Sequence, residues 1–194
     1  MRLIQVNKFH YLKGGAERYY LGLSAALVRR GHAVSHLAMA HPQNLPGGED
    51  DRFVAEVDYR LRAGLGESLR RAARTIHNRA AARAAAGMAR RQRPAVAHLH
   101  NIYHQLSPSV ISAFARAGVP MVQTLHDYKL ICPGYLLRTE GAVCERCRGG
   151  RYLHAVRHRC LLDSRAASAS ASSAAPGSGS PVRLWTPGWP HCIV

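Results

Sequence analysis

The sequence is poor in acidic residues and contains no long apolar run. Its 194 residues include 11 Asp and Glu against 27 Lys and Arg, so the formal net charge is +16. No apolar segment approaches the ~20 residues that a membrane-spanning helix needs. The N-terminal segment MRLIQVNKFHYLKGG lacks the long apolar region and the small-residue cleavage site of a secretory signal. We therefore expect a cytoplasmic protein.

Spacings typical of nucleic-acid-binding motifs are also missing, although the chain is strongly basic. Residues 60–93 contain ten arginines and a single acid, Glu67. No aromatic residues interleave with these arginines, and no helix-turn-helix or zinc-finger spacing accompanies them, which argues against nucleic acid as a partner. A solvated helix face explains the arginines without any ligand. They are also suited to contact anionic lipid at the inner face of the membrane, or an acidic glycan.

The chain has five cysteines but only one Cys-x2-Cys pair, Cys144 and Cys147. The lack of a second pair weakens the case for a zinc site without excluding it. Structural zinc can be held by four thiolates, or by three together with His154 or His158. The four candidate thiolates are Cys132, Cys144, Cys147 and Cys160. The predicted zinc site competes with two alternatives, which are disulfides in an oxidising compartment and free thiols.

The N-terminal part of the chain has the pattern of a folded α/β unit. Apolar residues make up 47% of the chain, which excludes a wholly disordered protein. Residues 2–6 are predicted to form a short buried strand, residues 16–30 a helix and residues 33–39 a second strand. A loop ending in Gly14 and Gly15 precedes the helix. Strand, glycine-rich loop, helix and strand in this order predict a βαβ unit of a parallel sheet.

The rest of the chain continues this alternation. The expected elements are a helix over residues 67–92, a strand over 95–100, a helix over 107–117 and a strand over 119–125. Ala80, Ala84 and Met88 belong to a thin apolar stripe on the first of these helices, and Ser107 is the expected N-cap of the second. The alternation predicts an α/β fold with a Rossmann-like open parallel sheet and flanking helices.

Ligands of open α/β sheets bind beyond the carboxyl ends of the strands. Three predicted loops at this edge hold the candidate site residues, which are Gly14, Gly15, Glu17, His100, Asn101, Tyr103, His126 and Asp127. Glycine lets a ligand approach the backbone, and a helix N-terminus presents free N–H groups to an anion. A histidine followed by an acid can orient a substrate hydroxyl or stabilise a developing charge. The glycine spacing matches neither GxGxxG nor the Walker pattern, and each residue alone also has a structural explanation.

Three segments resemble family-4 glycosyltransferases and occur in the order expected for that family. They are KFHYLKGGAERYYLGLSAALVRRGHAV, HLHNIYHQLSPSVISAFARAGVPMVQTLHDYKLICPG and CERCRGGRYLHAV, and the resemblance extends over about residues 1–170. It implies the N-terminal half of a GT-B fold, in which two Rossmann-like domains face each other across a cleft. In that family the N-terminal domain mainly binds the acceptor, and the C-terminal domain holds most of the nucleotide-sugar site.

The resemblance also implies roles for the candidate residues. It implies that Gly14 and Gly15 approach the donor diphosphate or the acceptor, and that the catalytic His126 lies near the transferred sugar with Asp127 supporting it. Such enzymes transfer a sugar from a nucleotide-sugar to a glycan or lipid-linked acceptor, as in polysaccharide biosynthesis. They usually retain the anomeric configuration and need no metal for catalysis. Positive groups and helix N-termini stabilise the leaving diphosphate.

Composition divides the chain into a domain and a tail. The domain is expected over residues 1–163, with a Cys-rich segment at 132–160, and residues 164–194 form a low-complexity tail that we expect to be disordered. The family carries paired glutamates eight positions apart in its donor-binding domain, and no two glutamates here have that separation. We therefore expect a truncated or frameshifted glycosyltransferase that is inactive alone, because catalysis needs donor and acceptor together. The alternative is a non-enzymatic basic module with a zinc-binding Cys cluster that binds nucleic acid or a partner protein.

Overall fold

The computed structural model describes residues 1–56, 66, 70, 73–75 and 77–173. The chain forms two compact units, Met1–Thr124 and Leu125–Ile193, and the second is described up to residue 173. The unit boundary therefore falls directly before the candidate residues His126 and Asp127. It also places the Cys-rich segment in the second unit, whereas the sequence predicted one domain over 1–163.

The first unit is built on a five-stranded parallel sheet. Its strands are β1 (Arg2–Val6), β2 (Ala33–Met39), β3 (Arg52–Val54), β4 (Val96–Leu99) and β5 (Met121–Gln123). They lie in the order β3-β2-β1-β4-β5, and every neighbouring pair is parallel. The chain moves outward from β1 to β3 and then crosses to the other side of β1, so the strand order reverses between β1 and β4. Ligands of such sheets bind at this reversal. The predicted Rossmann-like α/β fold is confirmed.

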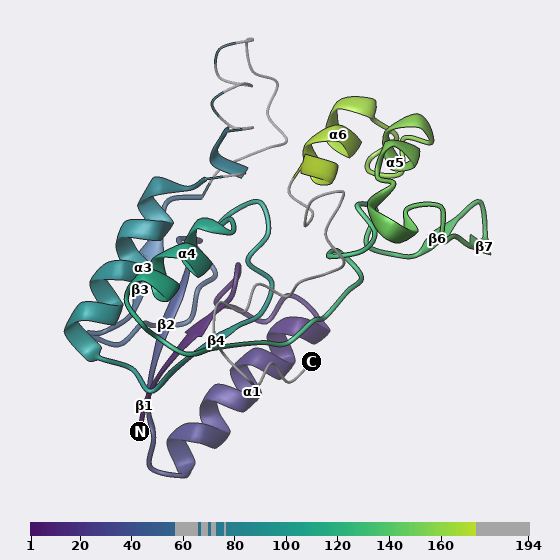
Figure 1. Ribbon diagram of the computed structural model, residues 1–194. Helices are drawn as coiled ribbons and strands as arrows, with labels where there is room; N and C mark the ends of the chain where they lie inside the picture. The colour runs from purple at the N-terminus through teal and green to yellow at the C-terminus, as the bar shows by residue number, and fades with distance from the viewer. Residues whose placement is uncertain (57–65, 67–69, 71–72, 76, 174–194) are drawn as a thin grey trace. The chain divides into compact units, whose positions relative to one another are not determined.

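Helices cover both faces of this sheet (Figure 1). Helices α3 (Arg79–Gln92) and α4 (Ser109–Arg116) pack side by side on one face, and α1 (Gly15–Arg29) lies on the other. The apolar core lies on the α3 and α4 side, where Ile4 and Val6 of β1 meet Met88 and Phe114 of the two helices. Burial of these side chains from water supplies the main stabilisation of the layer.

The face of the sheet beneath α1 is buried but polar. Gln5 of β1 lies opposite His36 of β2 on one side and opposite His98 of β4 on the other. Paired positions project from the same face of a sheet, so these side chains form a polar row across its centre. Tyr20 of α1 packs its ring 5.8 Å from that of His36. Buried polar atoms need hydrogen-bond partners, and the Ser24 hydroxyl of α1 provides one for Nε2 of His36, whereas Nε2 of Gln5 has none among the described residues.

The long helix predicted over residues 67–92 is wrong as one continuous element. Residues 77 and 78 are not helical, and α3 begins only at Arg79. Asn78 adopts an extended conformation, and its Oδ1 atom accepts hydrogen bonds from the backbone N–H groups of Ala80 and Ala81. An asparagine at this position caps a new helix. Residues 67–69, 71–72 and 76 of the predicted helix lie outside the described residues.

The predicted apolar stripe on this helix is also shifted. Ala80 is exposed and Ala84 is half-buried, whereas Ala81 and Ala85 are fully buried beside Met88. Alanine fills half of the positions of this helix, so hydropathy alone gives little contrast between its faces. The Asn78 cap and the packing of α3 against α4 decide which alanines are buried.

Two further differences concern short segments. The N-cap residue of α4 is Pro108 and not the predicted Ser107, which has a left-handed φ of 63°. The Ser107 hydroxyl still accepts a hydrogen bond from the N–H of Ser109, so it contributes to the start of the helix. Strand β3 is not predicted from the sequence, because its three residues are too few to show a period.

The second unit contains short elements. They are β6 (Arg138–Thr139), β7 (Ala142–Val143), the 3-10 helix η1 (Arg148–Gly150), α5 (Leu153–Arg157) and α6 (Arg165–Ser173). Strands β6 and β7 form an antiparallel hairpin, and α6 packs against α5. The prediction of a disordered tail from residue 164 is therefore wrong for 165–173, where buried Ser168 and Ala171 anchor the helix. Residues 174–194 lie outside the described residues. No helix within the described ranges is long and apolar enough to cross a membrane.

Candidate functional site

Asn7 joins the three segments that meet at the carboxyl edge of the sheet. It directly follows β1 and is fully buried. Its Nδ2 group donates to the Phe9 carbonyl at 2.8 Å and lies 3.4 Å from Oε1 of Glu17, while its Oδ1 atom accepts from the backbone N–H of Asn101 at 3.2 Å. A second link runs from the Lys8 N–H to the Asn101 carbonyl at 2.9 Å. The loops after β1 and β4 and the start of α1 are therefore held as one edge.

The predicted glycine pair lies at the N-terminus of α1 on this edge. Gly14 is the N-cap residue, Gly15 is the first helical residue, and both are exposed. Gly14 has φ −163°, an extended conformation that any residue adopts. A Cβ atom on Gly14 would come no closer than 3.6 Å to a neighbour, and one on Gly15 would meet nothing within 4 Å. The fold of this unit therefore does not itself require glycine at either position.

Two lysines add positive charge beside this helix terminus. The Nζ atom of Lys13 lies 3.8 Å from the centroid of the Phe9 ring, and that of Lys8 lies 4.6 Å from the same centroid. Lys13 directly precedes Gly14 in the chain. The partial positive charge of a helix N-terminus and nearby ammonium groups both favour an anion. The glycine edge is thus electrostatically suited to a phosphate or carboxylate.

Two other predicted substrate-binding residues are buried in the structure. Glu17 is 6% exposed, and its carboxylate accepts the hydrogen bond from Asn7. His100 is fully buried, with its Nε2 atom 2.7 Å from Oε1 of Gln5 and its ring stacked on His98. In this structure both side chains connect the segments of the edge, so their role in substrate binding stays a prediction.

Asn101 and Tyr103 follow β4 and are half-buried. The backbone N–H of Asn101 donates to the Asn7 side chain, and the Asn101 carbonyl accepts from the Lys8 N–H. The hydroxyl of Tyr103 lies 3.4 Å from Nε2 of Gln123, at the end of β5. These contacts place both residues at the carboxyl ends of the strands, as the sequence predicted.

The predicted catalytic residues lie at the start of the second unit. His126 and Asp127 are half-buried, and the Asp127 Oδ1 atom accepts a hydrogen bond from the N–H of Lys129 at 2.9 Å. This bond closes a local turn, which is a structural role that the sequence left open. The Nζ group of the buried Lys129 donates to the Pro133 carbonyl at 2.7 Å. The predicted convergence of His126 with the glycine pair involves both units and stays a prediction.

The four cysteines of the second unit influence one another electrostatically. Burial raises the pKa of the Cys147 thiol, and proximity to Cys132, Cys160 and Cys144 raises it further. Cys132 and Cys160 both approach Gly134, where an added Cβ atom would lie 3.8 Å from the Cys132 sulfur and 3.2 Å from Cβ of Cys160. No three of these thiols lie within 4.8 Å of one another among the described residues. The predicted zinc site therefore stays a prediction, and zinc would have to draw the sulfurs together.

A group that the sequence reasoning missed lies in the first unit. Ligand atoms of His10, His36 and Asp51 all lie within 4.8 Å of one another. His10 belongs to the loop after β1, His36 to β2, and Asp51 directly precedes β3. The sequence signal was a histidine within a largely apolar strand, AVSHLAM, which does not reveal partners 15 and 26 positions away.

The comparison with protein families decides the classification of the chain. The family model described as a glycosyl transferase 4-like domain matches residues 14–175, which include all the candidate site residues. The chain belongs to the glycosyl transferase 4-like domain family. The sequence resemblance to family-4 glycosyltransferases is confirmed at this level. No curated protein matches the chain.

Two glycosyltransferases of solved structure are similar to this glycosyl transferase 4-like domain. Glycosyltransferase VinC, solved in complex with DTDP, shares 15% identity over 93% of this chain and 46% of its own, with a TM-score of 0.42. Glycosyltransferase SnogD from Streptomyces nogalater shares 18% identity over 83% of this chain and 42% of its own, with a TM-score of 0.37. The chain thus spans less than half the length of either protein.

Proposed function

We propose that this domain is the acceptor-side half of a GT-B glycosyltransferase and binds substrate at the edge formed by the loops after β1 and β4. The reaction is transfer of a sugar from a nucleotide-sugar to a glycan or lipid-linked acceptor, in the cytoplasm and with retention of configuration. His126 lies beside the transferred sugar in this proposal, and Asp127 supports it. Sugar transfer also needs a donor-binding half, so we expect negligible transfer from these residues alone.

The main support for the proposal is the exposed glycine pair at the start of α1. Gly14 and Gly15 are exposed at a helix N-terminus, at the point where the strand order reverses, and neither needs to be glycine for the fold. Gly14 is the N-cap residue, a position where glycine is favoured over alanine, whereas at Gly15, inside the helix, glycine destabilises the folded state relative to alanine. A ligand that approaches the backbone closely gives Gly15 a reason to lack a side chain. The cations of Lys8 and Lys13 beside them favour a diphosphate or an acidic sugar.

Replacing Gly15 separates ligand binding from folding. We expect Gly15→Ala to weaken binding of UDP-glucose by about tenfold or more, because the added methyl group occupies the space of the ligand; tenfold corresponds to ~1.4 kcal/mol. Stability should stay equal or rise by about 0.5 kcal/mol, because alanine is the better helix former. Isothermal titration calorimetry and thermal unfolding of the full chain measure the two quantities.

Gly22 provides a matched control on the same helix. A Cβ atom at Gly22 also meets nothing within 4 Å, and the residue is exposed in the middle of α1. Gly22→Ala should raise stability by about 0.5–1 kcal/mol without changing ligand binding. Equal binding by wild type, Gly15→Ala and Gly22→Ala would show that the glycine pair does not contact the ligand.

The binding-module alternative is less well supported than the transferase proposal. It requires the arginines of residues 60–93 and the Cys cluster to form one joined surface. The cysteines belong to the second unit, and Arg60, Arg62 and Arg71 lie outside the described residues. The family model that matches residues 14–175 is described as a glycosyl transferase 4-like domain, which favours the transferase proposal. Within the transferase proposal, the arginines serve contact with anionic lipid or an acidic glycan.

A further inference from the structure

The cluster formed by His10, His36 and Asp51 joins three segments of the first unit and has no part in the proposed sugar transfer. His10 is 3% exposed, and the side chains of His36 and Asp51 are 15% and 7% exposed. The two imidazole rings lie with their centroids 4.5 Å apart. Two imidazoles and a carboxylate whose ligand atoms lie within 4.8 Å form a set that can bind a metal.

His36 has a partner at each of its ring nitrogens. Its Nε2 atom lies 3.2 Å from the Ser24 hydroxyl, whose oxygen also lies 3.0 Å from the Tyr20 carbonyl. Its Nδ1 atom lies 3.2 Å from both oxygens of Asp51, and the Asp51 Oδ1 atom also accepts the His36 backbone N–H at 2.6 Å. A proton on Nδ1 or a metal ion can each join the imidazole to the carboxylate.

The other two members have contacts that leave a ligand atom facing the cluster. The Tyr20 hydroxyl lies 2.8 Å from Nδ1 of His10, which leaves Nε2 of that ring available. The Asp51 Oδ2 atom accepts a hydrogen bond from the Gly48 N–H at 2.9 Å, which helps to fix the carboxylate beside His36. Metals bind neutral imidazole and ionised carboxylate.

We propose that His10, His36 and Asp51 bind a zinc ion through Nε2, Nδ1 and a carboxylate oxygen, with solvent in the fourth position. Three protein ligands with one open position is a common zinc coordination. The surrounding contacts match those of metal sites, in which the second nitrogen of each ligating histidine has a hydrogen-bond partner. Ser24 fills this role for His36 and Tyr20 for His10. The ion fixes the loop after β1, and with it the approach to the glycine pair, onto β2 and the start of β3.

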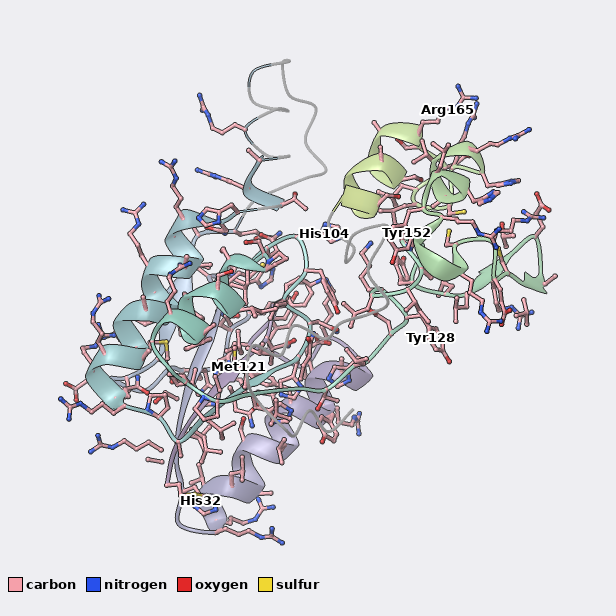
Figure 2. The ribbon with its side chains drawn as sticks, in the orientation of Figure 1. His32, His104, Met121, Tyr128, Tyr152 and Arg165 are labelled. Atoms are coloured by element: carbon pink, nitrogen blue, oxygen red, sulfur yellow. The ribbon has the colours of Figure 1, made fainter. Side chains whose placement is uncertain are left out.

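Zinc binding by the full chain tests this inference independently of any sugar ligand. Metal-free protein is titrated with zinc chloride, and the number of sites and their affinities are measured by calorimetry. Asp51→Asn retains the shape of the side chain and should lower the affinity of one site at least 100-fold. Ser24→Ala removes only a supporting contact and should lower it about tenfold. His32→Ala is the matched control. His32 follows the C-terminal end of α1 (Figure 2) and is not a member of the cluster, so this variant should bind zinc like wild type.

X-ray absorption at the zinc edge distinguishes this site from the Cys cluster. The inference predicts zinc with nitrogen and oxygen ligands in wild type, and loss of that component in Asp51→Asn. If Asp51→Asn fails to fold, by circular dichroism, the Ser24→Ala variant provides the same comparison. Zinc bound through sulfur alone, no zinc binding, or equal affinity in wild type, Asp51→Asn and Ser24→Ala would overturn the inference. A proton shared between His36 and Asp51 would then be the explanation of their contact.

Discussion

Tyr20→Ala is expected to destabilise the first unit by about 4 kcal/mol, in the range for truncation of a large aromatic side chain in a core. Tyr20 is fully buried and is among the largest buried side chains of the chain. Its ring lies 5.8 Å from that of His10 and 5.3 Å from that of His100, and its hydroxyl bonds to His10. The substitution thus removes both the packing and the hydrogen bond that hold α1 on the polar face of the sheet. Urea unfolding followed by circular dichroism measures the loss.

Two companion variants separate the contributions of Tyr20. Tyr20→Phe keeps the ring and should cost about 1 kcal/mol, because one hydrogen bond to His10 is lost. Tyr19→Ala alters the adjacent residue, which is 49% exposed, and should cost less than about 1 kcal/mol. If Tyr20→Ala and Tyr19→Ala are equally destabilising, α1 does not pack on the sheet through Tyr20.

Asn7→Ala is the second large effect, at about 3 kcal/mol. The substitution removes three hydrogen bonds in a fully buried environment, to Phe9, Glu17 and Asn101, and leaves their polar atoms without the partner. Net losses of about 1 kcal/mol per buried hydrogen bond give this sum. Since Asn7 joins the loops after β1 and β4 to α1, the variant should also weaken ligand binding at the glycine edge.

Asn44→Ala is the control for this prediction. The Asn44 side chain is half-buried and donates one hydrogen bond, to the Met39 carbonyl at 2.8 Å. Its loss should cost about 1 kcal/mol and leave ligand binding unchanged. Chemical denaturation of both variants, with UDP-glucose titrations, makes the comparison. An Asn7→Ala variant as stable as Asn44→Ala would contradict the joining role of Asn7.

Much of the sheet could be predicted from the sequence, because its strands are short apolar runs between clear turn signals. Strand β2 was predicted with its observed bounds, and β1 likewise. Gly118 follows the end of α4 and adopts the left-handed φ of 67° that favours glycine at a helix end. These features depend on local chemistry, which a single sequence displays directly.

Features that depend on partners distant in the chain could not be predicted. The buried face of α3 is set by a cap at Asn78, whose side chain also bonds to the Gln105 carbonyl 27 positions away. The polar row of Gln5, His36 and His98 arises from strand register, which apolar patterning does not specify for polar residues. His36 and His98 therefore look unrelated in the sequence, although they belong to one buried polar layer in the structure.

The candidate site, too, could be predicted only where it depends on local sequence. Gly14 and Gly15 were placed correctly at a helix N-terminus, because glycines between a strand and a helix have few other locations. Glu17 and His100 are predicted to bind substrate, and that role stays a prediction; the structure shows that both are buried and hydrogen-bonded to other residues of the edge. Burial of a polar residue depends on whether its partners are present, and those partners, Asn7 and Gln5, were not recognised as such in the sequence.

The most direct test of the proposed function follows the loops after β1 and β4 in a single titration. Adding UDP-glucose to the ¹⁵N-labelled chain is expected to shift the amide signals of Gly14 and Gly15 together with the amide signal of Asn101. All three signals should give the same dissociation constant, because one bound ligand contacts the edge that these loops form. Shifts at the glycines without any at Asn101, or the reverse, would contradict a shared substrate site at this edge and with it the proposed role of the domain in sugar transfer.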